Sequence, residues 1–185
     1  MDSIALTSND ELTTLIVESG VVTWDDLVRV VEQFHYGRNL NREDFDLVWS
    51  ERKGTCSSKH AFLKHVADLN KIPDITLMLC IYEMKEENTE GVGDVLTQYK
   101  LSSIPEAHCY LSTPMGKIDV TTAQSSFSKI ANDVLKEEII NAVDVVKYKV
   151  QQHKSFVDLW AEKNTHLSGS EVWKIREACI QALEQ

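Results

Sequence analysis

The sequence contains few residues that interrupt secondary structure, and it contains no repeat or linker. Only 3 prolines and 7 glycines occur among 185 residues, and they fall between segments with periodic apolar residues. No stretch is of low complexity or rich in Pro, Gly and Ser, so the sequence shows no domain boundary. A chain of this length with 43% hydrophobic residues suits one compact domain. We therefore expect residues 1–185 to form a single domain.

Positive charge and long apolar runs are also scarce. The chain has 19 Lys and Arg against 29 Asp and Glu, a formal charge of -10, and no basic cluster offsets it. Repulsion from phosphates argues against nucleic acids and anionic membranes as partners. Residues 1–7 lack the positively charged start of a signal peptide, and no later stretch is long enough to span a bilayer. We expect a cytoplasmic protein, and the sequence leaves its oligomeric state open.

The four cysteines are spread along the chain without a CxxC pair. In a chain expected in the cytoplasm, this spacing predicts reduced thiols and no disulfides. Cys80, Cys109 and Cys179 are flanked by apolar residues and should lie in the core, where free cysteines are common. Cys56 differs, because its neighbours Ser57 and Ser58 are polar and suit a helix start that faces solvent.

Capping patterns and apolar periodicity predict helices in both halves of the chain. The expected helices begin at 9–11, at Thr23 with Asp26 as a capping box, at Asn41 with Asp44, and at Thr55. The second should end near 36–37, the third at 53–54 and the fourth at 69. Everything after residue 120 is expected to be helical, mainly 144–163 and a last helix that opens at 170–171.

Strand patterns occupy the middle of the sequence. The apolar run 75–82 is short and bounded by polar segments, which predicts a buried central strand. Residues 107–111 alternate as a strand does, and 114–117 forms a turn into 118–120, which predicts an antiparallel hairpin. The predicted fold class is α+β, with helices packed around a small, mostly antiparallel sheet.

Cys56 has the surroundings of a nucleophile. A thiol attacks carbonyls as the thiolate, and a helix N-terminus with a nearby imidazolium lowers a thiol pKa from about 8.5 to between about 3.5 and 7.5. Gly54 allows a tight turn into the helix, and the free N–H groups of its first turn should point at the sulfur. The Cys56 N–H itself is a candidate donor to an oxyanion.

His108 and Asp119 supply the other two members of a catalytic triad. They lie on the two strands of the predicted hairpin, with the turn residues Pro114 and Gly116 between them. Asp119 accepting a hydrogen bond from Nδ1 of His108 would leave Nε2 facing Cys56.

Three segments carry a resemblance to a known family. They are Gly54-Thr55-Cys56-Ser57-Ser58-Lys59-His60, Ala107-His108-Cys109-Tyr110 and Ile118-Asp119-Val120-Thr121. In this order they resemble the three conserved boxes of the transglutaminase-like superfamily, over positions 50–122. The resemblance implies a papain-like core, with flanking N- and C-terminal helices, in which a helix cysteine meets a histidine and an aspartate on adjoining strands. Ser57 and Ser58 replace an aromatic residue found in many members, and Tyr110 replaces a tryptophan, so the pocket differs from that of better-known members.

The family's additional oxyanion donor has no clear match in this sequence. Candidates for an oxyanion or substrate contact are Gln33, Tyr36, Arg38, Asn39 and Ser57. The first four precede the nucleophile in the chain, and Ser57 directly follows it.

The resemblance implies a cysteine hydrolase or acyltransferase that acts on a peptide or small amide through a thioester, without a cofactor. One alternative is a binding or scaffold module on the same fold, with a partner surface on the C-terminal helices. That surface would use four aromatic residues that we expect more often in a core: Tyr148, Phe156, Trp160 and Trp173.

Zinc binding is the other alternative, because Cys56, His60, His108 and Cys109 are residue types that bind zinc. His108 and Cys109 are adjacent on a predicted strand and should point to opposite faces, which argues against a shared ion. We assign no metal site. The remaining histidines are expected at the surface or partly packed: His35, His60, His65, His153 and His166.

Overall fold

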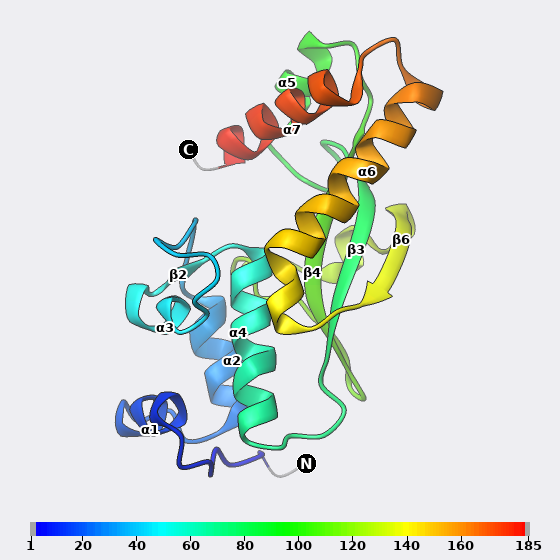
Figure 1. Ribbon diagram of the computed structural model, residues 1–185. Coiled ribbons are helices and arrows are strands. Elements are labelled where there is room, and N and C mark those ends of the chain that lie inside the picture. The colour runs from blue at the N-terminus through cyan, green and yellow to red at the C-terminus, as the bar shows by residue number, and fades with distance from the viewer. Residues whose placement is uncertain (1–2, 184–185) are drawn as a thin grey trace. The chain divides into compact units, whose positions relative to one another are not determined.

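The computed structural model describes residues 3–183, and this part of the chain has an α+β fold (Figure 1). Its α-helices are α1 (Glu11–Glu18), α2 (Trp24–Glu32), α3 (Leu47–Glu51), α4 (Cys56–Leu69), α5 (Gly93–Gln98), α6 (Lys147–Asn164) and α7 (Gly169–Leu183). Its strands are β1 (His35–Tyr36), β2 (Lys53–Gly54), β3 (Thr76–Met84), β4 (Ile104–Thr113), β5 (Gly116–Ile118) and β6 (Val134–Ile139). The predicted fold class is confirmed.

Four strands form one sheet in the order β5-β4-β3-β6, and β1 pairs with β2 in parallel. The predicted central strand is confirmed as β3, which has strands on both sides. The predicted hairpin is confirmed as β4 and β5, which are antiparallel with Leu111 opposite Ile118. Gly116 begins β5 with a φ of +128°, a conformation that glycine adopts without steric cost.

The described chain packs as two compact units. The first contains the chain through Met78, then Cys109–Phe127 and Ile139–Val146. The second contains Leu79–His108, Ser128–Glu138 and the chain from Lys147 onward. A single domain over 1–185 remains a prediction.

Helix α4 is the centre of the first unit. It contacts α1, α2 and α3, the short strand β2, and a 3-10 helix at Ala142–Val145. In Figure 1 the α4 and α2 ribbons run side by side. Ile16, Leu27, Phe62 and Val66 are fully buried between these helices. The element that carries Cys56 is therefore the most enclosed helix of its unit.

Two helices of the first unit differ from the predicted bounds. Thr23 caps α2 by accepting a hydrogen bond from the Asp26 N–H, and its hydroxyl donates to the Asp26 carboxylate, but α2 ends at Glu32 instead of near 36–37. The chain leaves the helix there because the backbone of β1 pairs with that of β2, with the His35 N–H donating to the Arg52 carbonyl. Strand pairing with a distant segment has replaced the last helical turn.

The predicted helix start at Asn41 and Asp44 is wrong, since α3 covers only Leu47–Glu51. Each of these side chains accepts a hydrogen bond from the backbone N–H two residues ahead. Such Asx turns compete with helix formation and hold 41–46 as a loop.

The second unit is built from α5, α6, α7, β6 and the adjoining parts of β3 and β4. Helix α7 packs against α6 and α5. The expectation that everything after residue 120 is helical is wrong, because β6 occupies Val134–Ile139. The four C-terminal aromatic residues are each half-buried, neither in a core nor fully exposed.

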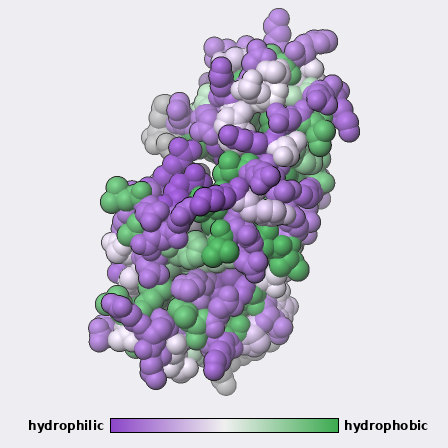
Figure 2. All heavy atoms as spheres, viewed as in Figure 1, coloured by the Kyte–Doolittle hydropathy of each residue, from purple (hydrophilic) through white to green (hydrophobic). Residues whose placement is uncertain are grey.

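Hydrophilic side chains cover much of the face shown in Figure 2, and hydrophobic ones occur there in small separate groups. None of the helices within residues 3–183 is long and apolar enough to cross a membrane.

Candidate active site

Cys56 is the first residue of the 14-residue helix α4, as predicted. Thr55 caps this helix, and its side chain accepts a hydrogen bond from the Ser58 N–H while Ser58 Oγ accepts from the Thr55 N–H at 2.9 Å. This capping box fixes the first turn. Cys56 itself is only 9% exposed.

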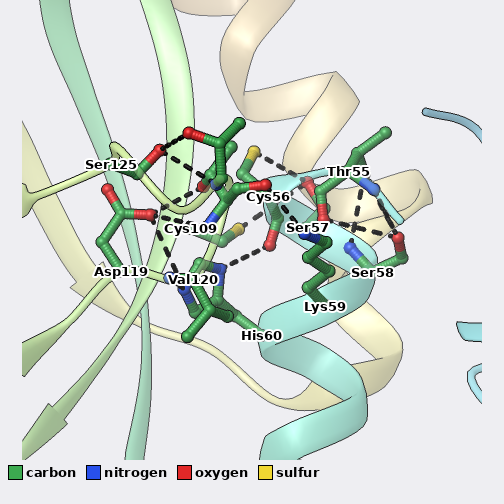
Figure 3. Close-up of polar contacts among 12 residues, drawn as sticks. Thr55, Cys56, Ser57, Ser58, Lys59, His60, Cys109, Asp119, Val120 and Ser125 are labelled. Carbon is green, nitrogen blue, oxygen red and sulfur yellow. Dashed lines mark hydrogen bonds and ion pairs between the residues drawn. The ribbon is translucent and has the colours of Figure 1, made fainter. Parts of the chain in front are cut away.

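Ser57 lies between two thiols. Its Oγ is 3.7 Å from Sγ of Cys56 and 3.9 Å from Sγ of Cys109. Figure 3 shows Ser57 between these two side chains. The expected solvent-facing position of Ser57 is wrong, since the residue is 5% exposed. The Ser57 hydroxyl has the thiols of Cys56 and Cys109 as hydrogen-bond partners, so it can be buried without a water molecule. The other thiols, Cys80, Cys109 and Cys179, are fully buried, which confirms the prediction for them.

Gly54 is required where β2 approaches the start of α4. A Cβ at this position would lie 2.8 Å from Cγ of Lys59 and 2.9 Å from Oγ of Ser58. Such distances are shorter than van der Waals contact, so any other residue would force the Lys59 and Ser58 side chains to move. The close approach of the Lys59 and Ser58 side chains to the backbone at position 54 explains the glycine there.

His60 is fully buried, although the sequence suggested a surface or partly packed ring. Its Nδ1 is 2.6 Å from the carbonyl oxygen of Cys56, and its Nε2 accepts a hydrogen bond of 2.9 Å from the N–H of Val120. The ring thus joins the first turn of α4 to the segment that follows β5 (Figure 3).

Asp119 belongs to that same segment, and its side chain is 6% exposed. Its Oδ1 accepts hydrogen bonds from the N–H and the Oγ1 of Thr121, at 3.1 and 2.7 Å. Nε2 of His60 lies 3.8 Å from Oδ1. The first unit therefore connects the Cys56 carbonyl, through the His60 ring, to the backbone N–H of Val120, which directly follows Asp119.

Lys59 is another buried polar residue of α4, beside Ser57 and His60. Its Nζ donates to the carbonyls of Phe34 and Thr121, at 2.7 and 2.9 Å. Burial lowers the pKa of Lys59 to about 8, against the opposing charges of Glu32 and Asp119. An ammonium enclosed by carbonyls loses much of its hydration, which disfavours the charged form.

His108 belongs to the second unit, on β4, where its ring is half-buried. The ring lies edge-on to Tyr82, with centroids 6.2 Å apart. Its pairing with Cys56 and Asp119 stays a prediction from the order of the motifs.

Three of the five candidate oxyanion or substrate residues line one pocket of the first unit. Arg38, Asn39 and Ser57 border about 250 Å³ of space that is open to solvent, together with Thr55 and Ser58. Gln33, exposed after α2, and Tyr36, half-buried in β1, lie outside this pocket.

Asn39 is occupied within its own loop. Its Nδ2 donates to the Lys53 carbonyl at 2.8 Å and to Oε2 of Glu51 at 3.1 Å. Since an amide nitrogen has two hydrogens, both are engaged. Asn39 holds the loop before α4 in shape, and it has no hydrogen left for an oxyanion.

A buried ionic cluster lies in the second unit, outside the predicted site. Glu106 accepts two hydrogen bonds of 2.6 Å from Arg176. Burial alone would raise the pKa of Glu106, but the charge and hydrogen bonds of Arg176 lower it to about 2. His153 is also buried, contrary to expectation, and its Nε2 is 2.9 Å from the Pro105 carbonyl.

Burial raises the pKa of Cys179 to about 11, which marks it as an unreactive thiol.

No group of three or more His, Cys, Asp or Glu side chains within residues 3–183 is arranged to hold a metal ion. Of the residues considered for zinc, His60 directs both ring nitrogens at backbone groups.

The sequence interpretation missed two residues of this site, Lys59 and His60. The only signal for them was their position in the helix, since His60 follows Cys56 by one helical turn.

Comparison with protein-family models, with curated proteins and with solved structures finds no match to this chain.

Proposed function

We propose that this chain is a cysteine-dependent hydrolase or acyltransferase of the transglutaminase-like kind, with a papain-like core. Its substrate is a peptide or other amide, and the reaction passes through a thioester. Cys56 is the nucleophile, His108 the general base and Asp119 the residue that orients His108.

The observation that carries the proposal is the position of Cys56. It occupies the first position of a capped 14-residue helix, where the N–H groups of the first turn favour a negative charge. The backbone N–H of Val120, which directly follows the buried Asp119, is joined to the same turn through His60. The assignment of His108 rests on the order of the three motifs in the sequence.

The chemistry follows from these roles. The Cys56 thiolate attacks the amide carbonyl carbon, and the backbone N–H of Cys56 donates to the resulting oxyanion. The imidazolium of His108 protonates the leaving amine as the C–N bond breaks, which leaves a thioester on Cys56. His108 then takes a proton from water or from an acceptor amine, which attacks the thioester and releases the thiol.

A screen of amide and ester substrates tests the proposal. Wild type is compared with Cys56→Ala and with Cys109→Ala, a matched control because its thiol also lies beside Ser57 Oγ. We expect product with wild type and Cys109→Ala, and none with Cys56→Ala. Equal turnover by both variants would remove Cys56 from the reaction.

Labelling tests the same proposal without a substrate. Iodoacetamide at neutral or mildly acidic pH should alkylate Cys56 much faster than Cys80, Cys109 or Cys179, as read by peptide mass spectrometry. Equally slow alkylation of all four thiols would favour a non-catalytic module on this fold.

A further inference from the structure

We infer that His60 is a positioning residue, which holds the turn that bears Cys56 in register with the segment that bears Asp119. The inference rests on the proposed function, since it assigns His60 a role in presenting that nucleophile. His60 does not touch the reacting atoms in this scheme and is not a catalytic residue.

The two hydrogen bonds of the ring define its protonation state. The Val120 N–H is a donor, so Nε2 of His60 must accept and carries no proton. The carbonyl of Cys56 is an acceptor, so Nδ1 must carry the proton and donate. His60 is therefore held as the neutral Nδ1–H tautomer. A second proton would place a donor on Nε2 against the donor N–H of Val120.

This assignment separates His60 from the general base. A base needs a ring nitrogen directed at the thiol, and both nitrogens of His60 are directed at backbone groups. The bonds instead connect segments 60 residues apart in the sequence, the first turn of α4 and the backbone next to Asp119. The ring is 0% exposed, so water cannot replace either partner without opening the core.

Register at this position matters because reactivity depends steeply on geometry. A displacement of about 1 Å at a catalytic group can lower a rate by about 100-fold. Without the ring, the Cys56 carbonyl loses a partner and the segment with Asp119 loses one of its two hydrogen bonds to α4, since Lys59 still donates to the Thr121 carbonyl. We therefore expect the thiol to lose its alignment while the helix itself remains folded.

Three substitutions at position 60 test the two hydrogen bonds of the ring separately. His60→Asn retains a donor near Nδ1, His60→Gln retains an acceptor near Nε2, and His60→Leu removes both. His65→Leu is the matched control, because His65 lies on the same helix and is half-buried, but its ring packs beside that of Phe45, with centroids 6.1 Å apart.

The experiment measures the alkylation rate of Cys56 by iodoacetamide as a function of pH in the full chain. Circular dichroism confirms folding of each variant. We expect His60→Leu to lower the rate at neutral pH by at least about tenfold and to move the pH midpoint toward that of an ordinary thiol. The Asn and Gln variants should fall between His60→Leu and wild type, and His65→Leu should match wild type. If His60→Leu does not fold, the Asn and Gln variants decide.

The outcomes distinguish the inference from the function on which it rests. If the folded His60 variants keep the wild-type pH midpoint, the positioning role is wrong and the proposed function stands. The same holds if they are alkylated faster at every pH, which is the effect of loosened packing. Wild-type Cys56 that labels no faster than Cys179 overturns both.

Discussion

The buried ammonium of Lys59 makes a quantitative prediction about stability and pH. Burial lowers the pKa of Lys59 from 10.5 to about 8 in the folded chain. Between these two values the unfolded chain binds more protons than the folded chain, so folding becomes more favourable as pH rises. Below pH 8 the residue is charged in both states, and the folded state bears the full cost of enclosing the charge.

The size of the effect follows from the shift. One pKa unit corresponds to about 1.4 kcal/mol, so the free energy of unfolding should rise by about 3 kcal/mol between about pH 8 and pH 10.5. Lys59 is 0% exposed, so solvent does not screen this term. Other groups titrate in the same range, and a comparison with Lys59→Met isolates the lysine.

The assay is urea unfolding of wild type and Lys59→Met at a series of pH values, with a two-state fit at each. In the Met variant the carbonyls of Phe34 and Thr121 lack their donor at every pH. This loss lowers the free energy of unfolding by the same amount at every pH, so a difference in pH dependence between the two proteins reports the titration of Lys59. Lys64→Met, on the same helix with its ammonium beside Asp68, controls for loss of a positive charge. Parallel curves for wild type and Lys59→Met would refute the reasoning.

Three further substitutions test the site and the two units. Asp119→Asn should leave circular dichroism unchanged and lower turnover by about 100-fold or more, because in the proposed triad His108 would lose its preferred tautomer; normal turnover would remove Asp119 from the proposed mechanism. Glu106→Gln leaves the buried Arg176 charge unpaired and should lower the free energy of unfolding at neutral pH by about 3 kcal/mol. The wild-type contribution of Glu106 should be present above pH 4.5 and lost as pH falls toward about 2, and an acid-unfolding curve identical to that of Glu106→Gln would contradict it. Gly54→Ala should destabilise the chain by about 1 to 3 kcal/mol, whereas Gly37→Ala, which meets only the flexible Lys53 side chain, should change it by less than about 1 kcal/mol in the same urea assay.

Local signals predicted the helix that carries Cys56. Thr55 is a favourable N-cap, and the apolar positions after it recur at helical spacing, so both the start and the end of α4 followed from the sequence. The turn at Pro114 and the short alternating segments beside it identified the β4 and β5 hairpin in the same way. In each case the interactions that fix the element lie within a few residues.

Elements fixed by distant pairing were missed. Strand β1 exists because its backbone pairs with β2, and α2 gives up its expected last turn for that pairing. Strand β6 alternates half-buried with exposed residues and contains a Lys-Glu-Glu run that favours a helix locally. Its position at the edge of the sheet, beside β3, decides its conformation. Tertiary context overrides local preference in both cases.

The roles of Lys59 and His60 could not be predicted for the same reason. Their partners are backbone atoms of segments as far as 62 residues away, and a backbone carbonyl or N–H leaves no mark in the sequence. A buried lysine or histidine is exceptional enough that composition alone argues against it.

Lys59 and His60 also explain why the start of α4 has buried polar side chains, although apolar side chains could fill the same space. An apolar side chain at position 59 or 60 would fill space without selecting one arrangement of the surrounding backbones. The Lys59 ammonium needs the carbonyls of Phe34 and Thr121 at once, and the His60 ring needs the Cys56 carbonyl and the Val120 N–H at once. Leaving any of these buried groups unpaired costs about 1 to 3 kcal/mol, so displaced arrangements are disfavoured. The free energy spent on enclosing the Lys59 ammonium at neutral pH therefore accompanies a fixed register between the first turn of α4 and the segment that contains Asp119. The His60 variants test this register.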